Sequence, residues 1–173
     1  MKLIVLANSH KLGGRCLAGI DVATGTWVRP ISSETHGELD ANRCLINENG
    51  RLRSVRCLDV IEIPIGEPVS TPGQPENRRL LVGDWSFIVS LDRQDAVDAL
   101  DSLALEDDST DLLFNKEGEV DYLEATNGLV LKSLTLVKVS SPSFYLRLRH
   151  GISPQLRAKF LFANIEYDLP VTD

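Results

Sequence analysis

The first thirty residues alternate between apolar runs and short polar turns, which is the pattern of a strand meander. Residues 3–7 form a continuous apolar run and predict a fully buried strand. Further strands are expected at residues 15–22 and 27–29, and turns that contain glycine separate the three strands. Pro30 is expected to end the third strand or to place it at a sheet edge, because proline has no N–H for a ladder.

The middle of the chain joins strand patterns to strong turn signals. Asn47-Glu48-Asn49-Gly50 predicts a hairpin tip, because the Asn-Gly pair tolerates positive φ. Branched apolar residues predict a strand within 57–64, and another strand is expected at 85–91. The stretch 66–77 is rich in proline and glycine and is typical of a connector between them.

The second half predicts one helix and several more strands. Asp92 is expected to cap a helix from residue 93 to about residue 103. Strands are expected at 129–139 and 144–149, and a strand pair within 159–168. Many short strands with few helices indicate small barrels rather than alternating βαβ units. We therefore predict a mostly β fold of two small barrels with one or two short helices.

The connector gives the expected domain boundary. A first barrel is expected over residues 1–70 and a second over residues 71–173, with room for strands exchanged between the two. No internal sequence repeat supports a solenoid or a propeller.

The net charge of −7 weighs against a nucleic-acid partner, but the charges are unevenly distributed. Residues 81–140 carry four Lys or Arg against thirteen Asp or Glu. Residues 1–80 and 141–173 each carry one more basic than acidic residue. Both ends of the chain are therefore able to present a local basic face.

The three cysteines, Cys16, Cys44 and Cys57, are odd in number and lack C-x-x-C spacing. They predict free, buried thiols rather than a disulfide framework or a zinc site. The histidines lack H-E-x-x-H spacing, and no G-x-S-x-G or Walker A motif is present. No apolar run reaches the roughly 20 residues that cross a bilayer. The sequence therefore shows no recognisable catalytic motif and favours a protein of the cytoplasm, away from membranes.

The segment from Asn8 to Arg15 is the first candidate for anion binding. Asn8, Ser9, Lys11 and Arg15 supply hydrogen-bond donors and positive charge beside two glycines. Glycines let backbone N–H groups approach a phosphate, and an arginine binds one with two parallel hydrogen bonds. The alternative is an ordinary polar hairpin loop.

Two strands carry aromatic and cationic side chains on one face. Trp27 and Arg29 lie two residues apart, as base stacking beside a phosphate contact requires. Tyr145, Arg147 and Arg149 form a similar stripe, with Leu146 and Leu148 expected to face the core. The alternatives are a core tryptophan with an arginine that reaches to solvent, and a plain solvated strand face.

Several segments resemble the bacterial dual OB-containing domain family, most specifically at the N-terminus. They are residues 2–9, 13–16, 19–21, 27–30, 58–60, 63–64, 74–77 and 165–173. The resemblance implies two packed OB-like barrels, in proteins that act around nucleic acid and in phage defence. It supplies no catalytic residues that carry over to this chain.

These observations predict a non-catalytic protein that binds single-stranded nucleic acid or a nucleotide, without a cofactor or a metal. OB barrels bind single strands through a charged groove and aromatic stacking. The alternatives are a protein-interaction or assembly module within a larger complex, and an enzyme with an unrecognised site. The expected nucleic-acid-binding residues are Asn8, Ser9, Lys11, Arg15, Trp27, Arg29, Tyr145, Arg147 and Arg149.

Overall fold

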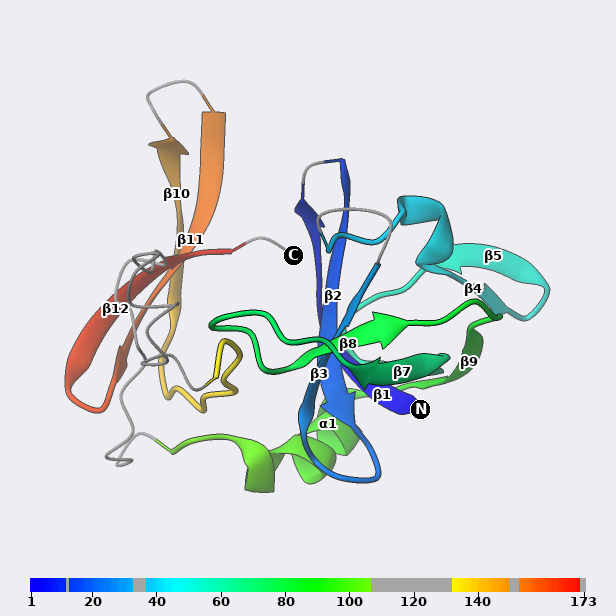
Figure 1. Cartoon of the computed structure of the whole chain (residues 1–173). Helices are drawn as coiled ribbons and strands as arrows, with labels where there is room; N and C mark the ends of the chain where they lie inside the picture. Colours follow the sequence, from blue (N-terminus) through cyan, green and yellow to red (C-terminus); the bar gives the residue numbers. More distant parts are fainter. Residues whose placement is uncertain (12, 33–36, 107–131, 150–152, 172–173) are drawn as a thin grey trace.

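The computed structural model of the chain is built mainly from β-strands, as the sequence predicts (Figure 1). It describes residues 1–11, 13–32, 37–106, 132–149 and 153–171. The strands are β1 (Lys2–Lys11), β2 (Gly14–Asp21), β3 (Trp27–Ile31), β4 (Leu45–Glu48), β5 (Arg51–Ser54), β6 (Asp59–Glu62), β7 (Ile65–Pro68), β8 (Asn77–Leu80), β9 (Ser86–Ser90), β10 (Ser143–Arg149), β11 (Ser153–Phe162) and β12 (Ile165–Pro170). The helices are α1 (Arg93–Leu100) and two 3₁₀ turns, Ala41–Arg43 and Asp101–Leu103.

Three sheets organise these strands. The largest has the order β7-β8-β3-β2-β1-β6-β9, and the others are β10-β11-β12 and the hairpin β4-β5. β8 and β9 follow residue 70 but pair within the sheet of β1, β2 and β3, so this sheet crosses the expected boundary. The division of the chain into barrels over 1–70 and 71–173 stays a prediction.

The seven-stranded sheet curls because one bent segment supplies β7, the strand at one end, and β6, the strand next to the other end. β6 pairs with β1, whereas β7 pairs with β8 at the far end, and only Ile63 and Pro64 separate β6 from β7. The Ile63 N–H donates to the Met1 carbonyl at 2.9 Å, and the Pro64 carbonyl accepts from the Leu81 N–H at 2.9 Å. The segment thus exchanges one neighbouring strand for another within two residues, which brings the ends of the sheet together.

The parallel pair of β3 and β8 explains how Pro30 sits inside a strand. β2 pairs only with Trp27 and Val28, and β8 takes over as the partner from Arg29 onward. The missing N–H of Pro30 therefore breaks no ladder with β2. The expectation that Pro30 ends the strand is wrong, because β3 continues to Ile31.

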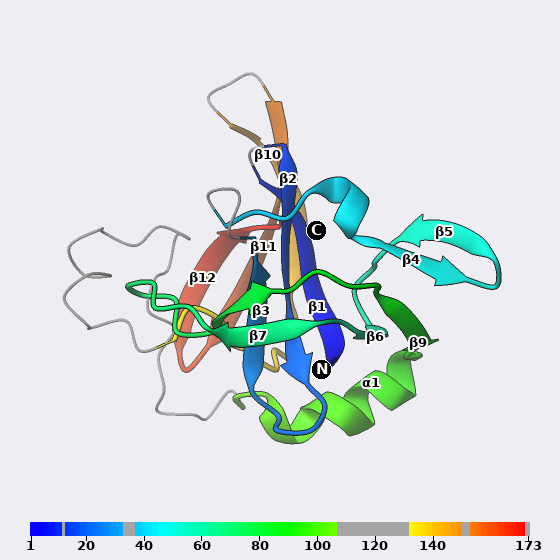
Figure 2. The ribbon, with the colours of Figure 1, turned by 45° about the vertical axis from the view of Figure 1, so that its right-hand side comes forward.

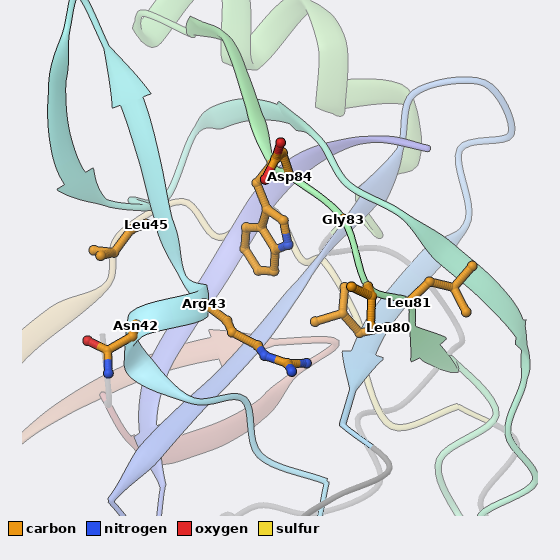
Figure 3. Close-up of a pocket in the computed structure, with 9 residues that line it drawn as sticks. Asn42, Arg43, Leu45, Leu80, Leu81, Gly83 and Asp84 are labelled. Carbon is orange, nitrogen blue, oxygen red and sulfur yellow. The ribbon is translucent and has the colours of Figure 1, made fainter.

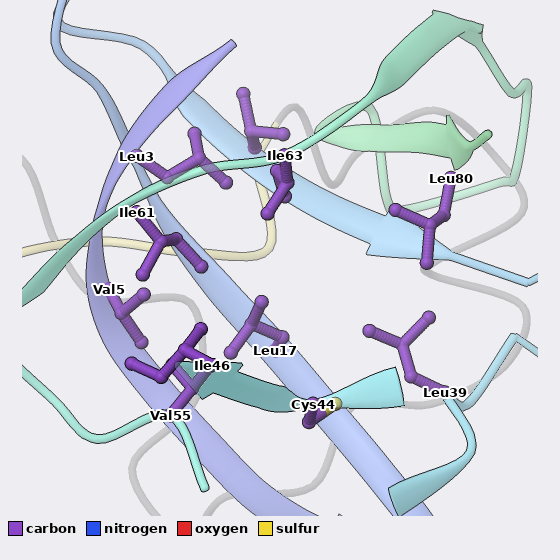
Figure 4. Close-up of a cluster of buried hydrophobic side chains, with 11 residues drawn as sticks. Leu3, Val5, Leu17, Leu39, Cys44, Ile46, Val55, Ile61, Ile63 and Leu80 are labelled. Carbon is purple, nitrogen blue, oxygen red and sulfur yellow. The ribbon is translucent and has the colours of Figure 1, made fainter. Parts of the chain in front are cut away.

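β1 is buried on both faces, which accounts for its continuous apolar run. Leu3 and Val5 point into the main core inside the curled sheet (Figure 4), whereas Ile4 points into a second core on the other side. The main core contains Leu3, Val5, Leu17, Val28, Leu39, Cys44, Ile46, Val55, Ile61, Ile63 and Leu80. The second core contains Ile4, Ile20, Val60, Ala96 and Leu100.

The predicted turns and helix cap are confirmed. Asn49 and Gly50 have φ of 52° and 83° at the tip of the β4-β5 hairpin, as an Asn-Gly turn requires. Ala163 and Asn164 also have positive φ between β11 and β12. The Asp92 side chain accepts from the Asp95 N–H at 2.9 Å and so caps α1.

The strand predicted at 129–139 is wrong in its described part. Between residues 132 and 139 the chain forms one isolated bridge, which pairs Val137 with Leu105, and no strand. Leu136 packs against the second core, so its apolar character reflects contact with that core rather than strand alternation. Residues 129–131 lie outside the described residues.

An ion-pair network around the buried Asp59 carboxylate fixes the β4-β5 hairpin to the main sheet. Arg53 donates to Asp59 at 2.7 and 3.0 Å and to Glu48 at 2.7 and 3.2 Å, and its guanidinium lies 5.0 Å from the Phe87 ring centre. Burial favours a higher pKa for Asp59, but hydrogen bonds from Arg53, Ser90 and a backbone N–H outweigh it and lower the pKa. The hydrogen bonds of Arg53 with Asp59 and Glu48 raise the pKa of the guanidinium.

We predict that Asp59→Asn destabilises the protein by roughly 3 kcal/mol near neutral pH, because it breaks a buried pair. A carboxylate whose folded pKa is lowered stabilises the protein above its unfolded pKa of about 4, and loses this effect as pH falls through the folded pKa. The stability difference between the two proteins, measured by urea unfolding, should therefore shrink below about pH 4. Glu62→Gln, at an exposed site on β6, is the matched control. A difference that is independent of pH would contradict the proposed role of Asp59.

None of the three cysteines forms a disulfide in the described part of the chain, and their burial differs. Cys44 is buried, and burial raises the pKa of its thiol to about 11. Cys16 is partly buried, and Cys57 is exposed. The expectation that all three thiols are buried is therefore wrong for Cys57, which lies between the buried Val55 and β6.

We predict one fast-reacting thiol in the native protein, because a thiol reagent requires access and a thiolate. Titration with a chromogenic disulfide should show a first phase that Cys57→Ser removes. Cys44 should react only on unfolding. Equal rates for all three thiols would contradict the described burial.

Candidate functional site

A polar hollow of about 240 Å³ lies beside the main core, where the loop before β9 meets the 3₁₀ turn that precedes β4 (Figure 3). Its lining combines an indole ring, a guanidinium, a carboxylate and a carboxamide. The lining residues are Asn42, Arg43, Leu45, Leu80, Leu81, Val82, Gly83, Asp84 and Trp85. We call this hollow the Trp85 pocket.

Local hydrogen bonds set both walls of the pocket. The Asp40 side chain accepts from the Asn42 N–H at 2.8 Å, and the Asp40 carbonyl accepts from the Arg43 N–H at 2.9 Å. These bonds hold the 3₁₀ turn that carries Asn42 and Arg43. On the opposite wall, the bond from the Leu81 N–H to the Pro64 carbonyl anchors the loop that leads to Trp85.

The floor of the pocket is apolar and its rim is charged. Leu80 is buried in the main core, and Trp85 is partly buried against the same core. Arg43 extends its side chain toward Leu80 (Figure 3), and both Arg43 and Asp84 are exposed. A flat aromatic ligand would find a ring to stack on, a cation for an anionic group and a carboxylate acceptor.

The segment from Asn8 to Arg15 forms the end of the β1-β2 hairpin. Asn8 is buried, its side-chain amide donates to the Val55 carbonyl at 2.7 Å, and its own carbonyl accepts from the Arg15 guanidinium at 3.2 Å. Ser9 is partly buried opposite Cys16. Lys11 ends β1, and its side chain lies outside the described residues.

Gly14 serves close packing of the chain. A Cβ at this position would lie 2.6 Å from the Leu39 carbonyl oxygen, which is closer than real Cβ contacts come. The neighbouring Arg15 exchanges backbone hydrogen bonds of 2.7 and 2.8 Å with Leu39. The glycine therefore lets the segment before the 3₁₀ turn cross the hairpin, and a phosphate cradle is not needed to explain it.

A segment that we call the strap, residues 132–138, lies over the Trp27 and Arg29 region of β3. The Arg29 guanidinium donates to the Ser133 hydroxyl at 3.0 Å. Trp27 is partly buried against the second core, where Leu136 of the strap also packs. Both side chains that were expected to bind nucleic acid thus make contacts within the chain.

The buried Glu76 carboxylate holds the strap in place. It accepts from the Ser133 N–H at 2.6 Å, the Ser133 hydroxyl at 2.8 Å and the Leu134 N–H at 3.2 Å. At the other end of the strap, Lys138 pairs with Asp101 at 2.7 Å. Residues 74–77 are among the segments that resemble the family. No sequence pattern indicates Ser133 as the partner of Glu76, because Ser133 lies 57 positions further along the chain.

Tyr145 and Arg147 lie on the three-stranded sheet. The Tyr145 hydroxyl donates to Asp168 at 2.6 Å, which raises the pKa of Tyr145, and Asp168 also pairs with Arg157 at 2.7 Å. Arg147 is exposed, and the side chain of Arg149 lies outside the described residues. Leu146 and Leu148 are 70% and 60% exposed, so the expectation that they face the core is wrong.

The β1-β2 and β10-β11 hairpins extend toward the same side of the molecule (Figures 1 and 2). Arg15 and Arg147 thus belong to hairpins that point the same way, although 131 positions separate them in the chain. The use of the nine expected residues as one nucleic-acid face stays a prediction.

The described residues contain no group of three or more His, Cys, Asp or Glu side chains placed to hold a metal ion. None of their helices has the length and apolar character to cross a bilayer.

We predict that Glu76→Ala lowers the free energy of unfolding by about 1.5–3 kcal/mol, the range for hydrogen bonds to a charged group. Denaturant unfolding of Glu76→Ala, with Glu67→Ala at an exposed site on β7 as the control, measures the effect. Equal stability of the two variants would show that the strap is not held by Glu76.

Comparisons with known proteins agree with the strand pattern. No curated protein and no solved structure matches the chain significantly. A family model described as the dual OB-containing domain matches residues 1–173. Because this match covers the whole chain, and the structure is mostly β with a curled sheet, the chain belongs to the dual OB-containing domain family.

Proposed function

We propose that the chain binds single-stranded nucleic acid or a nucleotide, with a base held in the Trp85 pocket. The observation that carries this proposal is the pairing of Trp85 with Arg43 in one hollow. Single-strand-binding proteins combine an aromatic ring, on which a base stacks, with cations that follow the backbone. Membership in an OB family favours a binding function, and OB barrels bind oligonucleotides and oligosaccharides.

The strap is the reason to place the base in this pocket. OB barrels commonly bind their ligands across the second and third strands. Here Arg29 of β3 is bonded to Ser133, and Trp27 shares a core with Leu136. The Trp85 pocket lies elsewhere, beside the main core, and its lining also combines an aromatic ring with a guanidinium.

The charges around the pocket favour modest affinity. Arg43 is the one cationic side chain among the described residues that line the pocket. Asp84 at the rim opposes this positive charge. We therefore expect one or two phosphate contacts, and a shallow dependence of affinity on salt.

A second candidate function is a protein-interaction module. The observation in its favour is the apolar face of β10, where Phe144, Leu146 and Leu148 are all at least 60% exposed. Exposed apolar patches of this kind mark protein contacts. The two functions use different surfaces, so each is testable separately.

We predict that a fluorescent single-stranded oligonucleotide binds the chain at low salt, and that fluorescence anisotropy detects the complex. Arg43→Ala should weaken binding and reduce the slope of log K against log salt by about 0.7, the value of one phosphate contact on a single strand. Arg51→Ala, at an exposed arginine of β5, is the matched control and should leave the slope unchanged.

The stacking contact has its own readout. In a Trp27→Phe background the indole fluorescence comes from Trp85, since the chain has two tryptophans, and a stacked base should quench it. Trp85→Leu should cost about 1–3 kcal/mol of binding, provided its melting curve shows a folded protein. Absence of binding by single-stranded DNA and RNA, or binding without quenching of Trp85, would contradict the proposal.

A further inference from the structure

One face of the three-stranded sheet changes from buried to exposed between its two edges. At the β12 side, Phe162 and Tyr167 are fully buried. At the β10 side, Phe144, Leu146 and Leu148 are 60%, 70% and 60% exposed. These three side chains share a face because they alternate along one strand.

Neighbouring residues of β11 extend this apolar surface. Leu146 pairs with Leu156, which is 39% exposed, and Phe144 and Leu148 pair with Ala158 and Pro154. Residues directly opposite each other in a ladder lie on the same face of the sheet. The exposed residues therefore form one contiguous patch rather than isolated side chains.

The same strand is an edge. Within the described part of the chain, β10 pairs with β11 on one side and with no strand on the other. Its seven residues contain no proline and no glycine, and its pairing with β11 is regular across the whole strand. Natural proteins protect such edges with charged side chains, proline, bulges or very short strands, and of these β10 has charged side chains, Arg147 and Arg149.

We propose that β10 is a dimer interface that pairs antiparallel with β10 of a second copy, with Leu146 opposite Leu146 of the partner. The pairing joins two three-stranded sheets into one, and it satisfies the outer backbone groups of both edge strands. It also places Phe144 of each copy opposite Leu148 of the partner. This inference uses none of the residues of the Trp85 pocket and does not depend on the proposed function.

Charge complementarity favours a second copy as the partner and fixes the register. With Leu146 at the two-fold axis, Tyr145 lies opposite the partner's Arg147, and Ser143 lies opposite the partner's Arg149. No arginine then faces an arginine, and an arginine beside an aromatic ring is favourable. The strand is thus complementary to itself, as a symmetric interface requires.

Other registers are worse on the same criteria. A two-fold axis at Arg147 sets two arginines directly opposite each other, which is destabilising. An axis at Tyr145 pairs only residues 143–147 of the strand, whereas an axis at Leu146 pairs all seven. A shift by one residue would place the apolar face of one copy beside the polar face of the other.

Cysteine crosslinking tests the register directly. Leu146→Cys in a Cys57→Ser background should form a disulfide-linked dimer on mild oxidation, because residues opposite each other in an antiparallel pair have Cα atoms about 4.5–5.5 Å apart. Tyr145→Cys is the matched control and should crosslink poorly with itself. A mixture of Tyr145→Cys and Arg147→Cys chains should instead form the mixed dimer.

Light scattering tests the dimer without crosslinking. The parent chain should have twice the mass of the 19.1 kDa monomer, and Leu146→Lys should be monomeric because it sets two charges together at the axis. Leu161→Lys, at a residue of β11 that is 54% exposed, should stay dimeric. Circular dichroism melting checks that the variants fold, and an exposed leucine should tolerate lysine.

Three results would overturn the proposal. They are a monomeric parent chain at high concentration, a dimer that Leu146→Lys does not affect, and crosslinking at residue 145 as efficient as at residue 146. Oligonucleotide binding by the monomeric Leu146→Lys variant would leave the proposed function intact, so failure of one proposal is distinguishable from failure of the other.

Discussion

The burial of β1 on both faces is the constraint on which the rest of the fold depends. A strand with apolar residues on both sides needs two covers, because each exposed face would leave apolar surface in water. The curled sheet, together with core residues between positions 39 and 55, supplies the first cover, around Leu3 and Val5. Helix α1 and the strap supply the second, around Ile4. The second cover also packs against Trp27 of β3, so it limits the access of a ligand to that strand.

The strap has two effects because it contacts both β3 and the second core, to which α1 contributes. Leu136 completes the second core, which stabilises the fold. The Ser133 hydroxyl at the same time accepts from Arg29 and donates to Glu76, so the Arg29 guanidinium of β3 is hydrogen-bonded within the chain. β3 is thus used here to hold the chain together. The Trp85 pocket, where we propose that a base binds, lies next to the main core instead.

Local signals predicted most of the strands well. The Asn-Gly turn, the Asp92 cap and the apolar run at 3–7 depend on neighbouring residues, so the sequence alone was enough to find them. The family match also confirmed the resemblance that the N-terminal motifs had indicated. The strand β3 was too short in the prediction because Pro30 is acceptable only where the pairing partner changes, and that depends on β8, about fifty residues away.

The candidate site was much harder to predict, because it depends on contacts between distant segments. Arg43 and Trp85 come from a 3₁₀ turn and a loop whose sequences carry no motif, and the two residues meet only in the folded chain. The hydrogen bond of Arg29 depends on Ser133, and no periodicity in the sequence indicates that these two residues meet. The prediction that Leu146 and Leu148 face the core was wrong for a different reason. Alternation shows that two faces differ, but it does not show that the apolar face is covered within the same chain.

Hydrogen exchange with and without a single-stranded oligonucleotide tests the division of roles between strap and pocket most directly. The Ser133 and Leu134 N–H groups donate to Glu76, so their exchange reports whether the strap is closed. If the ligand binds at the Trp85 pocket, these amides should stay protected in the complex, and residues 81–85 should gain protection. Faster exchange at Ser133 and Leu134 on binding, with new protection along β3, would show that the ligand displaces the strap, and it would contradict this division of roles.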